Sequence, residues 1–211
     1  MATVTLFDSI PKPLTEEFRP RRISDFVGLA KVKKVLSRLA EQPRECALLF
    51  LGEPGCGKSS MAAAFAAQLG AEVHSIGSAE CKLDTLQDLV RTNQFIPLSG
   101  GWHVNIVEEA DVMSDQAQKY LLSRLDGTAT CPRTIWIFTA NNVDRLEERF
   151  LSRCLRLDFG SYGSGSETAS LLEKIWRAKA PPDAEVPDFK RISRGNIRQA
   201  IQCLEVELLS V

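Results

Sequence analysis

Residues 46–59, CALLFLGEPGCGKS, decide the fold of this chain. The first six of these residues are apolar, as in a strand that is buried on both faces of a parallel sheet. Residues 52–59 then fit the pattern G-x-x-x-x-G-K-[ST]. An alanine-rich stretch follows at 58–69 and ends at Gly70, which predicts a helix. We therefore predict a strand, a glycine-rich phosphate-binding loop (P-loop) and a helix in direct succession.

The residue types of this loop suit phosphate chemistry. Glycines let backbone N–H groups point at phosphate oxygens, and the start of the next helix adds partial positive charge. Lys58 is expected to reach the β- and γ-phosphates of a nucleotide, and Ser59 to give its hydroxyl to Mg²⁺. The predicted nucleotide-binding residues are those of the loop and the first helical turn: Gly52, Glu53, Pro54, Gly55, Cys56, Gly57, Lys58, Ser59 and Ser60.

Apolar runs and amphipathic stretches alternate around this unit and predict an α/β fold. Besides 46–51, strands are expected at 71–76, 103–108, 134–140 and 155–159. Besides 58–69, helices are expected at 30–42, 82–92, 115–125 and 143–151. The predicted fold is a P-loop parallel five-stranded sheet flanked by helices, with a small C-terminal helical lid.

The lid is predicted from a change in composition. Residues 161–166, SYGSGS, have the composition of a linker, and no strand-like run follows them. Helices are expected at 167–180 and 196–209. The segment that contains them is too short to form an independent core. We therefore predict a P-loop nucleotide-binding domain at 1–160 and a helical lid domain at 161–211.

Composition and charge exclude several classes of protein. The 211 residues are 44% hydrophobic and 25% charged, and 26 basic against 27 acidic residues leave a net charge of −1. No overall field would draw the chain to nucleic acid or to an anionic membrane. The chain shows neither a membrane-spanning apolar run nor the pattern of a signal peptide, so we expect a cytoplasmic protein without a membrane partner.

The cysteines and histidines do not predict a metal cluster. Six cysteines are scattered without a C-x-x-C pair, and the two histidines, His74 and His103, have no paired spacing. We expect reduced cysteines that fill the core, and no structural zinc site.

Polar residues follow two of the predicted strands, where sites of parallel sheets lie. Glu108 and Glu109 end the strand at 103–108. Glu108 is expected to hold Mg²⁺ and Glu109 to polarise an attacking water. Asn141 follows the strand at 134–140 and could hold that water or the γ-phosphate. The alternative is a turn or helix-capping asparagine, which Asn142 favours.

In this order the motifs resemble those of the AAA+ ATPases and, within them, of the clamp-loader group that includes replication factor C. The resemblance covers about residues 16–205. Its group-specific parts are Glu17-Phe18-Arg19-Pro20, Asp25-Phe26-Val27-Gly28, Glu109-Ala110-Asp111 with Met113 and Ala117-Gln118, Ser152-Arg153-Cys154, and Gly195-Asn196-Ile197-Arg198-Gln199-Ala200.

The resemblance implies a role for several residues. It places Arg19, Val27 and Gly28 around the adenosine, makes Glu109 the catalytic carboxylate and makes Asn141 the first sensor of the nucleotide.

Two arginines receive roles from the resemblance alone. Arg198, in the last predicted helix, would be the second sensor. Arg153 would act as an arginine finger on ATP bound by a neighbouring subunit, where it meets the charge that develops on the γ-phosphoryl oxygens. The alternative for both is an ordinary surface ion pair.

Three departures from the family pattern bear on activity. Glu108 stands where the family usually has aspartate, so hydrolysis is expected to be slow. The segment Leu121-Leu122-Ser123-Arg124 lacks the arginine pair found there in clamp-loader subunits. The sequence ends at Val211, before the helical collar domain of those subunits, so we expect the chain alone to be mostly monomeric.

The expected function is that of an ATP-binding and ATP-hydrolysing subunit in DNA replication, which uses Mg²⁺ and works in an oligomer with other AAA+ subunits. DNA is an expected partner, through basic residues such as Lys82, Arg91 and Lys119, although a charged helix face is usually just solvated. A sliding clamp is a candidate further partner. The alternative is a nucleotide-gated binding module, or a protein of the helicase-loader or chaperone type, with little hydrolysis.

Overall fold

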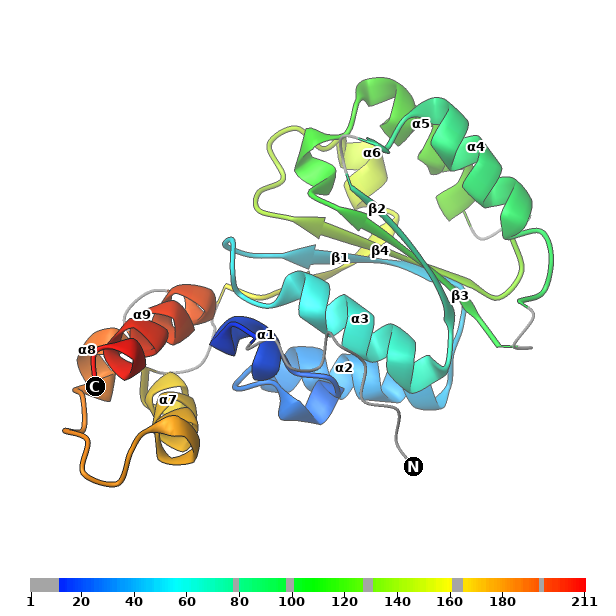
Figure 1. The fold of residues 1–211 in the computed structure, drawn as a ribbon. Coiled ribbons are helices and arrows are strands. Elements are labelled where there is room, and N and C mark those ends of the chain that lie inside the picture. Colours follow the sequence, from blue (N-terminus) through cyan, green and yellow to red (C-terminus); the bar gives the residue numbers. More distant parts are fainter. Residues whose placement is uncertain (1–11, 78–79, 98–100, 127–130, 161–164, 194–195) are drawn as a thin grey trace. The chain divides into compact units, whose positions relative to one another are not determined.

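The computed structural model describes residues 12–77, 80–97, 101–126, 131–160, 165–193 and 196–211 (Figure 1). The chain forms two compact units. The sheet unit comprises Pro20–Ser164, and the helical unit combines residues up to Arg19 with Gly165–Val211. Residues 161–164 of the predicted linker lie outside the described residues. Its last two residues, Gly165 and Ser166, begin helix α7 (Gly165–Lys179).

Five strands within the described residues form one parallel sheet, which confirms the predicted fold class. Their order across the sheet is β2-β3-β4-β1-β5. Strands β1, β3 and β4 have the predicted bounds, whereas β2 and β5 are shifted by one residue. The strands are β1 (Cys46–Leu51), β2 (Glu72–Gly77), β3 (His103–Glu108), β4 (Thr134–Ala140) and β5 (Cys154–Asp158).

Helices cover both faces of this sheet (Figure 1). On one face Leu48 and Phe50 pack with α2 (Ala30–Glu41) and α3 (Lys58–Leu69). On the other face Ala47 and Leu49 pack with α4 (Leu83–Thr92), α5 (Asp115–Leu125) and α6 (Glu148–Leu151). Because successive side chains of a strand point to opposite faces, a strand buried between two helical layers must be apolar throughout.

The carboxyl ends of β3, β4 and β1 lie next to one another, because these strands are parallel neighbours. The P-loop leaves β1 at this edge, and the N–H of Gly52 donates to the carbonyl oxygen of Ala140, the last residue of β4, at 3.2 Å. Glu108 ends β3 and Asn141 follows β4 at the same edge. The topology thus brings the P-loop, Glu108 and Asn141 to the same edge of the sheet.

The helix predicted at 143–151 is shorter than expected, since only α6 is an α-helix. The buried side chain of Gln118, in α5, makes two hydrogen bonds to the turn that precedes α6. Its amide nitrogen donates to the carbonyl oxygen of Arg145 at 3.0 Å, and its oxygen accepts from the N–H of Glu147 at 2.9 Å. These bonds hold residues 145–147 in a turn, so the helix begins only after Glu147.

The helical unit consists of α1 (Leu14–Glu17), α7, α8 (Phe189–Ile192) and α9 (Ile197–Leu209) in the described residues. Leu14 belongs to its apolar core together with residues such as Ile175, Trp176 and Leu204. The N–H of Leu14 donates to Glu205 at 3.0 Å, and Glu17 pairs with Lys179 at 2.5 Å. The sequence assigned residues 12–19 to the domain at 1–160, but the structure groups them with the C-terminal helices because Leu14 buries its side chain there.

All six cysteines are free thiols. Five belong to the sheet unit and are buried or partly buried, as expected for core residues, whereas Cys203 in α9 is exposed. Burial raises the pKa of Cys46 and of Cys81 to about 11, and that of Cys154 to about 12. The prediction of core cysteines is therefore wrong for Cys203.

In the part of the chain that the structure describes, no helix is both long enough and apolar enough to cross a membrane.

Candidate nucleotide-binding site

The loop between β1 and α3 has a backbone that requires its glycines. Gly55 and Gly57 have positive φ angles of 78° and 94°, a conformation that side chains disfavour. At Gly52 the reason is space, since a Cβ atom there would lie 2.9 Å from Cβ of Phe159. The thiol of Cys56 fills the loop from inside, and burial raises its pKa, so it stays neutral.

Lys58 folds its side chain back over the loop. Its ammonium group donates to the carbonyl oxygens of Gly52 at 2.7 Å and Glu53 at 3.0 Å, and to Oδ1 of Asn141 at 3.0 Å. These three oxygens are uncharged, so they satisfy the hydrogen-bond donors without neutralising the positive charge. Phosphate oxygens can replace them one for one.

The bond to Lys58 bears on the two interpretations of Asn141. The side-chain oxygen of Asn141 accepts from Lys58, whereas the turn that follows is capped by its neighbour Asn142, whose Oδ1 accepts from the N–H of Asp144 at 3.2 Å. The structure therefore brings the predicted sensor to the predicted phosphate site.

Ser59 and Glu108 lie side by side. The hydroxyl of Ser59, in the first turn of α3, donates to Oε2 of Glu108 at 3.3 Å. A hydroxyl and a carboxylate from two different elements are the hard oxygen donors that Mg²⁺ prefers. The residues present therefore fit the predicted Mg²⁺ position, and the longer side chain of Glu108 spans the gap to Ser59.

Glu109 has a backbone conformation that is unusual for its type. Its φ and ψ angles of 53° and 47° are left-handed, which costs a non-glycine residue about 1 kcal/mol. The N–H of Glu109 donates to the hydroxyl of Thr139, in β4, at 3.1 Å, and helix η4 (Ala110–Val112) follows directly. Strain of this kind gathers at functional sites, where the surrounding structure holds it. Sequence reasoning missed this role of Thr139.

Arg153 makes its hydrogen bonds within its own chain. Its guanidinium donates twice to the carboxylate of Asp126, at 2.6 and 3.2 Å, and once to the carbonyl oxygen of Arg149 at 2.7 Å. The hydrogen bond to Asp126 raises the pKa of Arg153 further above its ordinary value. Asp126 is a second residue that the sequence did not single out, because 27 residues separate it from Arg153.

The residues predicted to line the adenosine fall into both units. Val27 and Gly28 lie in the sheet unit, between η2 (Ile23–Asp25) and α2, and Gly28 has a positive φ of 62°. Helix η2 packs against α2 and α3, which places this turn beside the P-loop helix. Arg19 and Arg198 belong to the helical unit. There Arg19 pairs with Glu16, and Arg198 is exposed in the first turn of α9.

Of the basic residues considered for DNA contact, Arg91 lies in α4, Lys119 lies in α5, and Lys82 directly precedes α4. Arg91 is paired with Asp88 at 3.1 Å, whereas Lys82 and Lys119 are exposed.

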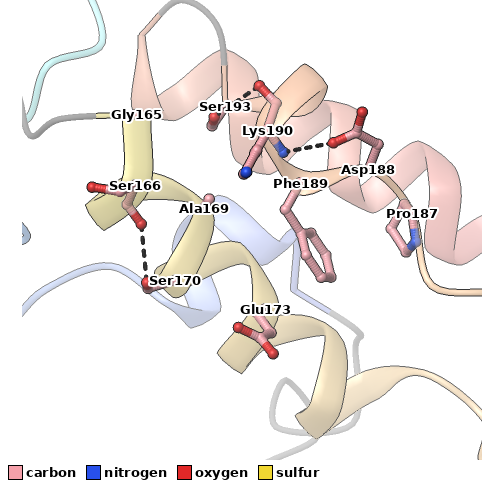
Figure 2. A pocket seen from close by; sticks show the side chains of 10 residues that line it. All are labelled: Gly165, Ser166, Ala169, Ser170, Glu173, Pro187, Asp188, Phe189, Lys190 and Ser193. Atoms are coloured by element: carbon pink, nitrogen blue, oxygen red, sulfur yellow. Dashed lines mark hydrogen bonds between the residues drawn. The ribbon is translucent and has the colours of Figure 1, made fainter.

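A separate hollow of about 780 Å³ lies in the helical unit between α7 and α8 (Figure 2). Ser166, Ser170, Glu173 and Phe189 are among its lining residues, and none of the predicted site residues lines it. The hydroxyl of Ser170 donates to the carbonyl oxygen of Ser166 at 2.9 Å, within the same helix α7. This hollow is therefore separate from the residues that the sequence predicts to bind phosphate.

Comparison with known protein families places the site in context. The model of the ATPase family associated with various cellular activities (AAA) matches residues 48–161, which contain the P-loop, Glu108, Glu109, Asn141 and Arg153. The match covers more than half of the 211 residues.

Curated relatives include subunits of replication factor C. A small subunit from Methanocella arvoryzae is 28% identical over 201 residues, which are 90% of this chain and 62% of that protein. Subunit 2 from Oryza sativa is 27% identical and covers 92% of this chain and 62% of the relative. For subunit 4 from Homo sapiens the values are 26%, 92% and 58%. The chain thus spans about three fifths of the length of these relatives.

Solved structures show the same fold. The RuvB Holliday junction branch migration motor of Thermotoga maritima superposes with a TM-score of 0.71 at 19% identity, over 89% of this chain and 64% of that one. A variant of that RuvB gives a TM-score of 0.74 at 20% identity.

Proposed function

The chain belongs to the AAA family of ATPases, and from this premise we propose that it binds and hydrolyses ATP with Mg²⁺ as a clamp-loader-like subunit in DNA replication. The observation that carries the proposal is the meeting of Lys58 with Gly52 and Asn141 at the carboxyl edge of the sheet. A cation, a glycine loop and an amide at one point suit a polyphosphate, and the replication factor C relatives favour the replication context.

The proposed chemistry assigns one task to each residue. Lys58 and the N–H groups of the P-loop hold the β- and γ-phosphates, and Ser59 with Glu108 would hold Mg²⁺. The ion, when bound, offsets negative charge on the phosphates. Glu109 orients and polarises the attacking water, and the amide of Asn141 leaves Lys58 to meet that water or the γ-phosphate. Slow turnover is proposed because Glu108 replaces the usual aspartate.

The proposed active form is an oligomer. Arg153 would reach ATP bound by a neighbouring AAA+ subunit, and Arg198 in the helical unit would respond to the nucleotide as the second sensor. Arg19, Val27 and Gly28 would line the adenosine. Other AAA+ subunits, DNA and a sliding clamp are the proposed partners, because curated relatives are subunits of replication factor C. The predicted cytoplasmic location and the division near residue 160 into a nucleotide-binding domain and a lid remain part of the proposal.

A second candidate is a nucleotide-gated binding module with little hydrolysis. The observation that favours it is the bidentate pair of Arg153 with Asp126, which engages the proposed finger within its own chain. If that pair persists in an assembly, ATP would change the surface of the subunit without being turned over.

Replacement of Lys58 tests both candidate functions, because both require ATP binding at the P-loop. We expect Lys58→Ala to abolish detectable ATP binding in calorimetry, because the loop loses its one charged donor. The matched control is Lys119→Ala, which removes an exposed lysine of the same unit and should leave ATP affinity unchanged. Circular dichroism of both variants checks the fold. Equal ATP affinity of Lys58→Ala and the parent would contradict the P-loop assignment.

Binding to primer-template DNA separates the two candidates. A salt titration with and without a non-hydrolysable ATP analogue measures whether the nucleotide controls DNA contact. DNA-stimulated phosphate release supports the ATPase subunit, and ATP-dependent binding without turnover supports the binding module.

A further inference from the structure

Two histidines and a glutamate meet on neighbouring strands at the β2 edge of the sheet. In the parallel pairing of β2 with β3, Glu72 lies beside His103. His74 follows two residues after Glu72 and therefore shares its face. One donor atom from each of Glu72, His74 and His103 lies within 4.8 Å of the others. No sequence pattern predicts this cluster, because 29 residues separate the histidines and only the strand register brings them together.

The spacing of these atoms suits a tetrahedral metal ion. Nε2 of His74 lies 3.3 Å from Nδ1 of His103, and 3.7 Å from Oε1 of Glu72. Bonds of about 2.0–2.1 Å from zinc to nitrogen at tetrahedral angles put two ligand nitrogens about 3.3–3.4 Å apart. The imidazole pair already has this separation, and a small rotation of the partly exposed Glu72 completes a three-ligand set.

A backbone carbonyl group fixes the orientation of the His103 ring. Its Nε2 lies 2.8 Å from the carbonyl oxygen of Phe95. A carbonyl oxygen can only accept, so Nε2 carries the proton. In the neutral ring, Nδ1 then presents its lone pair toward His74. A backbone carbonyl bonded to the second ring nitrogen is the usual outer partner of a metal-binding histidine.

Asn105 supplies an independent observation. It is the register partner of His74 on β3 and lies two residues after His103, so it shares the face of the cluster. Asn105 is fully buried, and neither its amide nitrogen nor its amide oxygen has a hydrogen-bond partner. An unpartnered buried amide is unfavourable, because folding removes the water that would otherwise bond to it. A hydrogen bond between the two histidines leaves this amide unexplained, whereas a water held on an ion beside His74 would give it a partner.

We propose that Glu72, His74 and His103 form a binding site for a divalent transition-metal ion, with Zn²⁺ as the ion that the donors fit best. Two imidazoles select zinc over Mg²⁺, which prefers oxygen ligands only. Three protein ligands leave a fourth position for a water, on the sheet face that Asn105 shares. The ion would tie the edge strand β2 to β3. The inference is independent of the proposed function, because it uses none of the P-loop residues.

Zinc titration of the full chain tests this site. The protein is stripped of metal with a chelator and titrated with ZnCl₂ in a calorimeter. We expect one Zn²⁺ per chain with a Kd of about 10 µM or tighter. Excess zinc should raise the melting temperature by about 5 °C, because the ion binds the folded chain only. Cobalt in place of zinc should give the visible absorption bands of tetrahedral Co²⁺.

Variants assign the ligands. His74→Gln and Glu72→Gln alter partly exposed side chains and should each weaken zinc binding by about tenfold or more. The matched controls are Glu80→Gln, which removes an exposed carboxylate of the same unit, and Cys203→Ser, which removes the exposed thiol. Both controls should bind zinc like the parent.

Two results would overturn the proposal. One is zinc binding that is weaker than about 100 µM or non-stoichiometric. The other is binding that persists unchanged in both His74→Gln and Glu72→Gln. The first result would mean that the ion is adventitious, and the second that zinc binds elsewhere on the chain. In both cases the two histidines share an ordinary hydrogen bond. Melting curves in the absence of metal show whether a variant still folds, and the Glu72 variant decides if the histidine variant does not.

Discussion

At the scale of single residues, the proposed roles fall to different side chains: Lys58 binds the phosphates, and Glu109 acts on the attacking water. Lys58 is only 8% exposed, and three uncharged oxygens accept hydrogen bonds from its ammonium group. A buried cation without hydrogen bonds would be costly, so the loop carbonyls stabilise the lysine in the position from which we propose that it binds phosphate. Glu109 is exposed and directly follows β3, so its carboxylate is accessible to water, as its proposed role requires.

Replacing Glu109 with Gln tests this separation. The variant keeps the size of the side chain and removes the negative charge that polarises water. We expect ATP affinity to stay within about twofold of the parent, while phosphate release falls by about a hundredfold or more. Calorimetry gives the first value and a steady-state phosphate assay gives the second.

Glu108→Gln is the companion variant. Because Glu108 contacts Ser59, its replacement should raise the Mg²⁺ concentration needed for half-maximal turnover. The two carboxylates have been assigned in the wrong order if Glu108→Gln abolishes hydrolysis at saturating Mg²⁺ while Glu109→Gln does not.

At the scale of elements, the site depends on how one strand supports its neighbour. Strand β4 is buried along its whole length, and its Thr139 holds the left-handed turn at Glu109 after β3. The next residue but one, Asn141, meets Lys58 of α3. One strand end therefore supports both the carboxylate and the lysine.

Thr139→Val should weaken this support. Valine has the shape of threonine without the hydroxyl, so the N–H of Glu109 loses its partner. We expect turnover to fall by about tenfold with ATP affinity unchanged, and the free energy of unfolding to fall by about 1 kcal/mol. Denaturant unfolding and phosphate release measure the two effects. Thr139→Ser keeps the hydroxyl and should retain most of the activity, and an equal loss in both variants would speak against the hydrogen bond.

The sequence predicts those parts of the structure that local chemistry determines. Fourteen residues, 46–59, predict a strand, a loop and the start of a helix. The apolar run at 46–51 predicts the strand, and the spacing of Gly52, Gly57 and Lys58 predicts the loop and the helix start. The order of apolar runs then predicts a parallel sheet.

Contacts between distant segments were beyond sequence reasoning. The turn before α6 is set by Gln118 from another helix, and the anchor of Glu109 comes from β4. Asp126 reaches Arg153 only because α5 ends beside α6 in the fold. No pattern in the sequence encodes these pairings, since each depends on the register and packing of elements that lie 27 to 30 residues apart.

At the scale of the whole molecule, the position of Arg153 bears on assembly. The residue follows α6 and is held by Asp126, which directly follows α5, so both lie on the α5–α6 side of the sheet unit. An arginine that acts on another subunit must leave such a pair when that subunit presents the stronger charge of bound ATP. Activity should therefore rise with protein concentration or with an added partner.

Mixing two inactive variants tests a shared site. Arg153→Ala has an intact P-loop and no finger, whereas Lys58→Ala has a finger and no P-loop. A mixture should restore part of the phosphate release that neither variant shows alone, because each composite site takes one half from each chain. Arg156→Ala, which removes an exposed arginine paired with Asp158, is the control and should match the parent. Absence of restoration at every ratio, with turnover per chain independent of concentration, would identify Arg153 as a structural residue.

The distribution of the six thiols makes the chain suited to site-specific labelling without mutagenesis. A maleimide dye reacts with accessible thiolate, so burial and the raised pKa values of about 11 to 12 protect Cys46, Cys81 and Cys154 at neutral pH. Cys203 is exposed in α9. We expect one equivalent of dye to attach at this position well before the others, as peptide mass spectrometry can check. A fluorophore on α9 would then report, by its anisotropy or energy transfer, whether ATP alters the surroundings of the helical unit.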